Sequence, residues 1–130
     1  MAFYLDTSAL VKLVVAEPET AALRLWIERA DQDLVTSDLA RTELMRVARQ
    51  VAPDRVLLAR EVLESVSIVE VATAVFEEAG RLHPADLRSL DAIHLAAALD
   101  LGDDLAGLVT YDKRLAEGAS ANGIEPIAPH

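Results

Sequence analysis

The chain alternates short, uninterrupted apolar runs with longer stretches in which apolar residues recur every three or four positions. The short runs lack a polar face, as is typical of strands buried on both sides of a sheet. The longer stretches have the period of amphipathic helices. The predicted strands cover Phe3–Leu5, Leu34–Thr36, Ser67–Val71, Leu108–Thr110 and Pro126–Ala128, of which the last has the weakest pattern. The predicted helices cover residues 8–15, 19–30, 38–51, 54–65, 73–83, 89–101 and 112–121.

The order of these elements predicts an α/β fold. Strands that are separated by helices pair in parallel through right-handed crossovers. We therefore expect a three-layer α/β/α sandwich with a short, mainly parallel sheet of four or five strands. Apolar density is even from end to end and no repeat or linker interrupts it, so a single domain over residues 1–130 is expected. Breakers agree with these bounds, since Pro18 and Pro53 lie at helix starts and Gly102 follows a helix end.

Composition indicates a core of aliphatic side chains, because 52% of the residues are hydrophobic and only 4% are aromatic. The chain has no cysteine, which excludes disulfides and thiolate metal sites and fits a reducing cytoplasm. No apolar stretch reaches the roughly 18 residues that indicate a membrane span. Asp6 interrupts the N-terminal apolar run, and no basic leader precedes it. We therefore expect a cytoplasmic protein without a signal peptide or membrane segment.

The charge is strongly acidic, with 22 Asp and Glu against 12 Lys and Arg and a formal net charge of −10. This is the wrong sign for a protein that would bind phosphate groups through its overall charge. Either nucleic acid is not the partner, or a metal ion or a basic protein adds positive charge locally.

Two acidic residues follow predicted strands directly. Asp6 comes after Phe3–Leu5, and Asp112 comes just after Leu108–Thr110. In an open parallel sheet, ligands bind at the carboxyl ends of the strands. Each of these acids can equally be the N-cap of the following helix, because Asp is favoured there. For either acid alone, both interpretations stay open.

Two more acids lie in apolar surroundings on helices. Glu43 comes three residues after Ala40 and so lies on or beside the apolar stripe of its helix. The alternative is a side chain that reaches water or pairs with Arg46. Asp91 is the only charged residue of the almost wholly apolar run Ser89–Leu99, in whose first turn the helix dipole favours an acid by ~0.3–1 kcal/mol. Ser89 is available as the cap of that helix, so Asp91 is not needed for capping.

Taken jointly, the four acids Asp6, Glu43, Asp91 and Asp112 are expected at one edge of the sheet. Two carboxylates about 4 Å apart repel by about 4 kcal/mol at an effective dielectric constant of about 20. A fold accommodates such a cluster if a cation bridges the acids or if protons neutralise some of them. Oxygen ligands without sulfur or a histidine cluster favour a hard ion, Mg²⁺ or Mn²⁺.

Other polar residues near these acids allow two readings each. Thr7 and Ser8 orient the Asp6 carboxylate or cap the first helix. His94 lies three residues after Asp91 and is more typical of a satisfied core histidine than of a catalytic one. Basic side chains expected near the mouth of the site, and so candidates for phosphate contacts, are Lys12, Arg41, Arg46 and Arg49.

Four short motifs carry a resemblance to a known family: YLDTSALVKL at the N-terminus, then TSDLARTEL, LDAIHLAAAL and LVTYDKRL. Each is short, but together, in this order and spacing, they are fairly specific. The chain resembles a PIN-domain ribonuclease over its whole length, and within that group a VapC-like toxin of a bacterial toxin–antitoxin pair.

The resemblance implies a metal-dependent endoribonuclease. It assigns catalysis to Asp6, Glu43, Asp91 and Asp112, with Mg²⁺ or Mn²⁺ on the three aspartates and with Ser8 and Thr110 as supporting hydroxyls. It also implies a homodimer and a cognate antitoxin whose basic C-terminal segment inserts toward the acids. Some members have a further acid just after the last one, where this chain has Lys113 and Arg114. This departure makes the metal role of Asp112 weaker than that of Asp6 and Asp91.

Two other functions remain as alternatives. A catalytically inactive PIN-like interaction module would share the fold, but all four acids are present. A phosphoryl-transfer domain of the phosphatase or receiver type needs a further acid near Asp6, and a phosphatase would have it where Ser8 stands.

Overall fold

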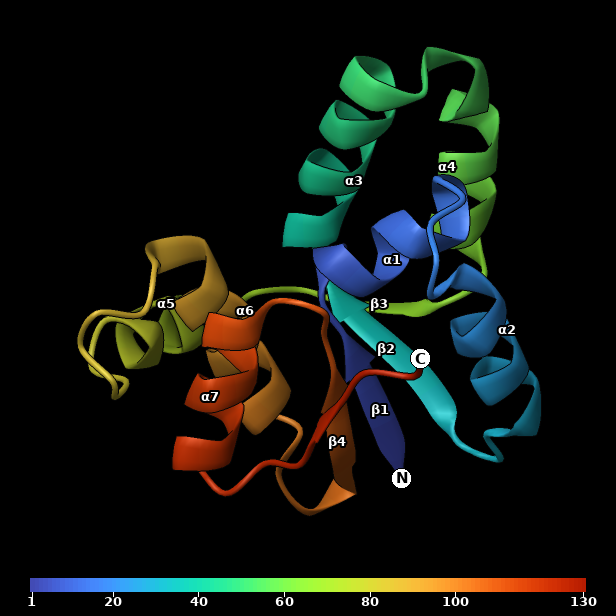
Figure 1. The fold of residues 1–130 in the computed structure, drawn as a ribbon. Helices are drawn as coiled ribbons and strands as arrows, with labels where there is room; N and C mark the ends of the chain where they lie inside the picture. Colours follow the sequence, from blue (N-terminus) through green and yellow to red (C-terminus); the bar gives the residue numbers. More distant parts are fainter.

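The computed structural model describes residues 1–130 and has a parallel five-stranded sheet with helices on both faces (Figure 1). The strands lie in the order β3-β2-β1-β4-β5, and every neighbouring pair is parallel. The predicted three-layer α/β/α sandwich is therefore confirmed. The strands are β1 (Ala2–Leu5), β2 (Asp33–Ser37), β3 (Ser67–Val69), β4 (Leu105–Val109) and β5 (Pro126–Ile127). The helices are α1 (Thr7–Val14), α2 (Thr20–Arg29), α3 (Leu39–Val51), α4 (Val56–Glu64), α5 (Thr73–Ala79), α6 (Ser89–Leu99) and α7 (Lys113–Ala121), with short 3-10 turns at Pro53–Arg55 and Gly102–Asp104.

Most boundaries lie within two residues of the predicted ones; the start of β4 and the end of α5 differ more. The edge strand β3 ends at Val69, because its pairing with β2 stops there. Strand β4 begins at Leu105, where it pairs with Ala2 of β1, and it ends one residue before Thr110. Helix α5 ends at Ala79 rather than at residue 83, because Gly80 occupies its C-cap position.

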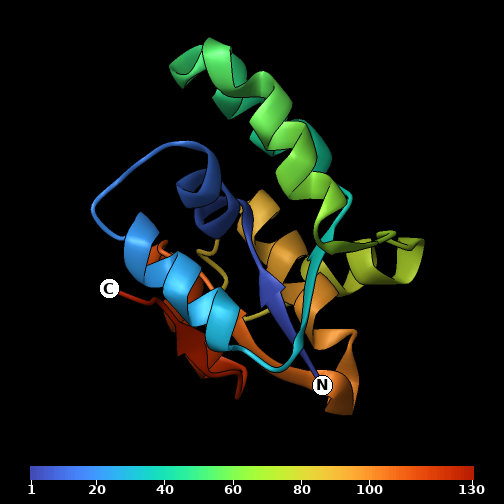
Figure 2. The same ribbon diagram turned by 90° about the vertical axis from the view of Figure 1, so that its right-hand side faces the viewer.

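The sheet separates two apolar cores. Tyr4 of β1 points to one face, where it packs with residues of α5, α6 and α7. Leu5 points to the other face and packs with residues of α1, α2, α3 and α4. This alternation is the period of two that a strand imposes on its side chains. Helices α3 and α4 pair with each other and extend past the edge of the sheet (Figure 2). None of the helices is long and apolar enough to cross a membrane.

Gly107 of β4 lies where a side chain would collide with the neighbouring strand. A Cβ atom there would be 2.7 Å from Cδ1 of Ile127 and 3.2 Å from the carbonyl oxygen of Glu125. We expect Gly107→Ala to lower the free energy of unfolding by about 1–3 kcal/mol, the usual cost of overpacking. Chemical denaturation measures the change, and Gly80→Ala is the control, because a Cβ atom at Gly80 would meet only carbonyl oxygens at 3.4 Å or more. Equal effects of the two variants would contradict this account.

Candidate active site

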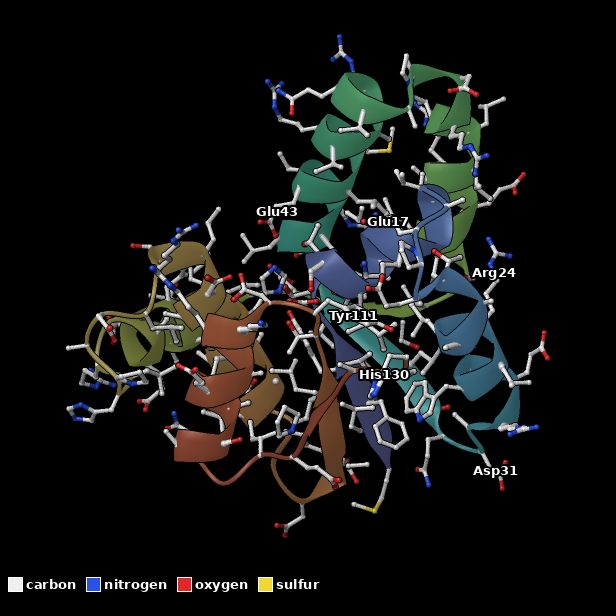
Figure 3. The ribbon with its side chains drawn as sticks, in the orientation of Figure 1. Glu17, Arg24, Asp31, Glu43, Tyr111 and His130 are labelled. Carbon is white, nitrogen blue, oxygen red and sulfur yellow. The ribbon has the colours of Figure 1, made fainter.

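The candidate site lies at the carboxyl ends of β1 and β4, the two central neighbours of the sheet. Asp6 follows β1 directly, and its backbone N–H donates to the carbonyl oxygen of Val109 at the end of β4. Asp112 comes three residues after Val109 and is the N-cap of α7. Helix α6 brings Asp91 to this edge in its first turn, and α3 brings Glu43. Glu43 projects from the base of α3 on the side that faces α6 (Figure 3).

Asp6 is the N-cap of α1, one of the two roles that the sequence left open, and it also lies at the carboxyl edge of the sheet. As the N-cap of α1 its Oδ1 accepts from the backbone N–H of Ala9 at 3.0 Å and from the Ser8 hydroxyl at 2.7 Å. Its Oδ2 accepts from the Thr110 hydroxyl at 2.6 Å. The side chain is buried, and burial raises the pKa of Asp6 even though these three hydrogen bonds oppose the rise. The Asp6 carboxylate is therefore fixed in orientation and shielded from solvent.

Ser8 and Thr110 fix Asp6 to the loop that follows β4. Besides donating to Asp6, Ser8 Oγ accepts from the backbone N–H of Tyr111 at 2.9 Å. Thr110 Oγ1 likewise accepts from the backbone N–H of Asp112 at 3.1 Å. The two residues predicted as supporting hydroxyls thus join the ends of both central strands.

Asp112 is also a helix cap. One of its oxygens, Oδ1, accepts from the backbone N–H groups of Arg114 at 2.8 Å and Leu115 at 3.1 Å. No hydrogen bond reaches Oδ2. Capping therefore occupies one oxygen of Asp112 and leaves the other for a ligand.

Asp91 is the carboxylate without partners. Burial raises its pKa, and the negative charges of Asp112 and Asp6 raise it further. Asp91 is therefore the aspartate on which the charges of the other two act. The expectation that Ser89 caps this helix is wrong: α6 begins at Ser89, Arg88 occupies the cap position, and no side chain caps the helix.

Glu43 is held by two residues that sequence reasoning did not assign to it. Its Oε1 accepts from the Thr7 hydroxyl at 2.7 Å and lies 2.6 Å from Nε2 of His94. Burial would raise the pKa of Glu43, but the hydrogen bonds from His94 and Thr7 outweigh burial and lower it. Glu43 forms no ion pair with Arg46, so that alternative is wrong. The polar His94 within an apolar helix was the one signal for this contact in the sequence.

The lowered pKa makes the contribution of Glu43 to stability depend on pH. The ionised form is favoured in the folded chain, so its contribution is present above the ordinary pKa of 4.5 and is lost as pH falls through the lowered value. We expect the difference in unfolding free energy between wild type and Glu43→Gln to be largest at neutral pH and to shrink in acid. Denaturation at a series of pH values measures it, and a difference that grows in acid would contradict the assignment.

The comparisons with known proteins decide the family. Residues 3–120 match the family model of the PIN domain. The chain belongs to the PIN domain family. This PIN domain is 45% identical to a protein named Ribonuclease VapC47 of Mycobacterium tuberculosis (strain CDC 1551 / Oshkosh), over 97% of this chain and 96% of that relative. It is 44% identical to Ribonuclease VapC46 of M. tuberculosis (strain ATCC 25618 / H37Rv), over 98% of both chains.

Solved structures share the fold of this PIN domain at low sequence identity. The crystal structure of VapC20 of M. tuberculosis, a toxin that cleaves the sarcin–ricin loop, has a TM-score of 0.78 at 17% identity and covers 98% of this chain and 99% of its own. A toxin–antitoxin complex from Klebsiella pneumoniae has a TM-score of 0.75 at 21% identity and covers 100% of this chain and 98% of its own. Within the family, the chain groups with the VapC proteins.

The acidic side chains of this PIN domain have the donor atoms that a hard cation prefers, but their positions do not form a complete ligand set. The donors are carboxylate oxygens, and Asp91 and Oδ2 of Asp112 have no protein partner. However, no three acidic or histidine side chains converge closely enough to hold one ion. A bound ion would therefore take few direct carboxylate ligands, and water would complete its coordination.

The basic residues predicted to contact phosphate differ in whether they already pair with acidic side chains. The Lys12 ammonium is 2.8 Å from Oε2 of Glu19 and 3.5 Å from Oε2 of Glu17, and its side chain is only 11% exposed. Arg41 pairs with Asp38 at 3.1 Å. Arg46 and Arg49 are exposed on α3 and form no ion pair. The free cations on α3 are thus these last two.

Proposed function

We propose that this protein is a metal-dependent endoribonuclease that serves as the toxin of a toxin–antitoxin pair. Its relatives are named ribonucleases of the VapC group, which supports a nuclease of that kind. The observation that carries the metal dependence is Asp91, a carboxylate without a protein partner whose pKa is raised by burial and by its neighbours Asp112 and Asp6. A cation at this point would offset that repulsion and would attract a phosphate group.

Asp6, Asp91 and Asp112 would hold Mg²⁺ or Mn²⁺ partly through water molecules, in the roles that the family resemblance implies. Such an ion, when bound, supplies positive charge for the scissile phosphate and lowers the pKa of water. Ser8 and Thr110 keep the Asp6 carboxylate in one orientation, so its position is set before RNA binds. The lowered pKa of Glu43 favours its ionised form, which can orient the attacking water. Hydrolysis by water would leave a 5′-phosphate and a 3′-hydroxyl.

The test is RNA cleavage by the purified protein with Mg²⁺, with Mn²⁺ and with a chelator. We expect cleavage with either metal, loss of cleavage with the chelator, recovery when metal is added back, and products with 5′-phosphate ends. Cleavage that persists in the chelator would overturn the metal dependence. A folded protein that neither cleaves RNA with metal nor arrests growth on expression would favour the alternative of an inactive interaction module.

The proposed partner is a cognate antitoxin with a basic C-terminal segment. The net charge of −10 and the unpartnered Asp91 at the sheet edge would attract such a segment. Co-expression with the product of a small neighbouring reading frame tests this, with restored growth and co-purification as the expected result. The homodimer stays a prediction, which the mass in solution would test.

RNA is expected to contact the exposed face of α3. Arg46→Glu and Arg49→Glu, made in a cleavage-deficient background, should weaken RNA binding and reduce the slope of log K against log salt by about 1 for each lost phosphate contact. Fluorescence anisotropy at several salt concentrations measures both quantities. Arg29→Glu on α2 is the matched control, because Arg29 is exposed and also forms no ion pair. An equal loss of affinity in Arg29→Glu would show that the effect comes from net charge and not from contacts on α3.

A further inference from the structure

We propose that His94 is a positioning residue that holds Glu43 in its working orientation through a buried chain of hydrogen bonds, Glu43–His94–Tyr4–Ser37. The proposal rests on the proposed function, since it deepens the role of Glu43 in RNA cleavage. It gives a positioning role to His94, which the sequence indicated was a core histidine.

Both ring nitrogens of His94 are engaged. Nε2 lies 2.6 Å from Oε1 of Glu43, and Nδ1 lies 2.7 Å from the Tyr4 hydroxyl. The Tyr4 hydroxyl in turn donates to Ser37 Oγ at 2.8 Å. The side chain of His94 is 3% exposed, and Tyr4 and Ser37 are fully buried. A rotation of the imidazole ring would break both contacts at once, so the ring is fixed.

The chain of contacts joins four elements that meet only in the folded protein. Glu43 belongs to α3, His94 to α6, and Tyr4 and Ser37 to β1 and β2. The ring of His94 also packs edge-on against Tyr4, with centroids 5.8 Å apart and an angle of 70° between the planes. Helix α3 extends past the sheet with α4 (Figure 2), and His94 ties its base to the sheet. The position of the Glu43 side chain is therefore set from the rigid centre of the fold rather than from α3 alone.

The geometry favours a role in catalysis rather than in packing alone, because the two carboxylate oxygens of Glu43 have different surroundings. Oε1 receives both protein contacts, from Thr7 and His94, whereas Oε2 has none. The side chain is still 26% exposed, so the Oε2 atom is left for water or substrate. A free glutamate would lose rotamer entropy on ordering. Here that ordering precedes substrate binding, which is the arrangement that speeds a reaction.

The test uses two amides that each replace one ring nitrogen. His94→Gln places an amide N–H near the position of Nε2 and can still donate to Glu43. His94→Asn places its amide near Nδ1 and keeps only the Tyr4 contact. We expect His94→Gln to cleave RNA almost as fast as wild type, and His94→Asn to lose about tenfold to hundredfold in kcat with little change in KM. Thermal denaturation of both variants identifies any loss that comes from unfolding.

A second readout does not need activity. The ¹³C signal of the Glu43 carboxylate should titrate at a higher pH in His94→Asn than in wild type, and near the wild-type value in His94→Gln. Equal kcat in wild type and His94→Asn, or equal losses in both variants, would overturn the positioning role. If wild type cleaves no RNA, the proposed function fails by itself, and the Glu43 titration alone then supports or overturns the role of His94.

Discussion

Asp91→Asn is expected to abolish RNA cleavage and, at the same time, to make the protein more stable at neutral pH. The raised pKa of Asp91 means that the folded chain favours its neutral form, so the ionised carboxylate lowers stability above that pKa. Asparagine removes the charge, and no hydrogen bond to Asp91 is lost, since it has none. Asparagine also removes a carboxylate oxygen from the proposed metal site, so the ion binds less tightly and cleavage is lost. Denaturation and RNA cleavage of the same preparation measure the two effects.

The matched control is Asp103→Asn, which makes the same substitution in the exposed turn Gly102–Asp104. It should leave both cleavage and stability near the wild-type values. A stable Asp91→Asn protein that still cleaves RNA with Mg²⁺ would sink the proposed mechanism. A fall in stability would instead show that Asp91 is favourably partnered in solution.

Asp6→Ala is expected to lose cleavage and also to lose about 2 kcal/mol of unfolding free energy, the combined scale of a lost N-cap and of buried donors left without acceptors. The groups left behind are the backbone N–H of Ala9 and the hydroxyls of Ser8 and Thr110. Chemical denaturation measures the loss. Asp6→Asn keeps one oxygen in place and is expected to be more stable than Asp6→Ala, while also inactive.

This difference bears on growth assays. Relief of growth arrest by Asp6→Ala would mix loss of catalysis with loss of folded protein, whereas Asp91→Asn separates them. An Asp6→Ala protein as stable as wild type would contradict the capping geometry described above.

Much of the fold could be predicted because it follows from local periodicity. Strand β1 is a short apolar run that ends where Asp6 begins, and β2 is built around the apolar pair Leu34 and Val35. The same logic located Asp6 and Asp112, since an acid directly after a buried strand lies at the ligand-binding edge. Helix α5 was predicted too long, because the sequence after Ala79 stays compatible with a helix and only Gly80 marks its end.

The partners inside the site could not be predicted, because they depend on how distant elements pack. Thr7 and Glu43 are 36 residues apart, and Glu43 and His94 are 51 residues apart. No local pattern encodes these contacts. Lys12 is the opposite case: Glu17 and Glu19 follow it closely in sequence, and a turn between α1 and α2 brings both to its ammonium group. The acids close to Lys12 in the sequence therefore indicated that its ammonium group is not free to contact phosphate.

Asp6 caps α1 and also belongs to the candidate site. This has a consequence for how the sequence would change once selection for activity is lost. A toxin that escapes selection for activity accumulates mutations, but a change at Asp6 removes part of the folding free energy together with the nuclease. A change at Asp91 costs the fold nothing by the same reasoning. Degenerate copies that still produce a protein should therefore keep the aspartate after the first strand and lose the one on α6. Counting substitutions at the two positions among silenced copies would measure this asymmetry.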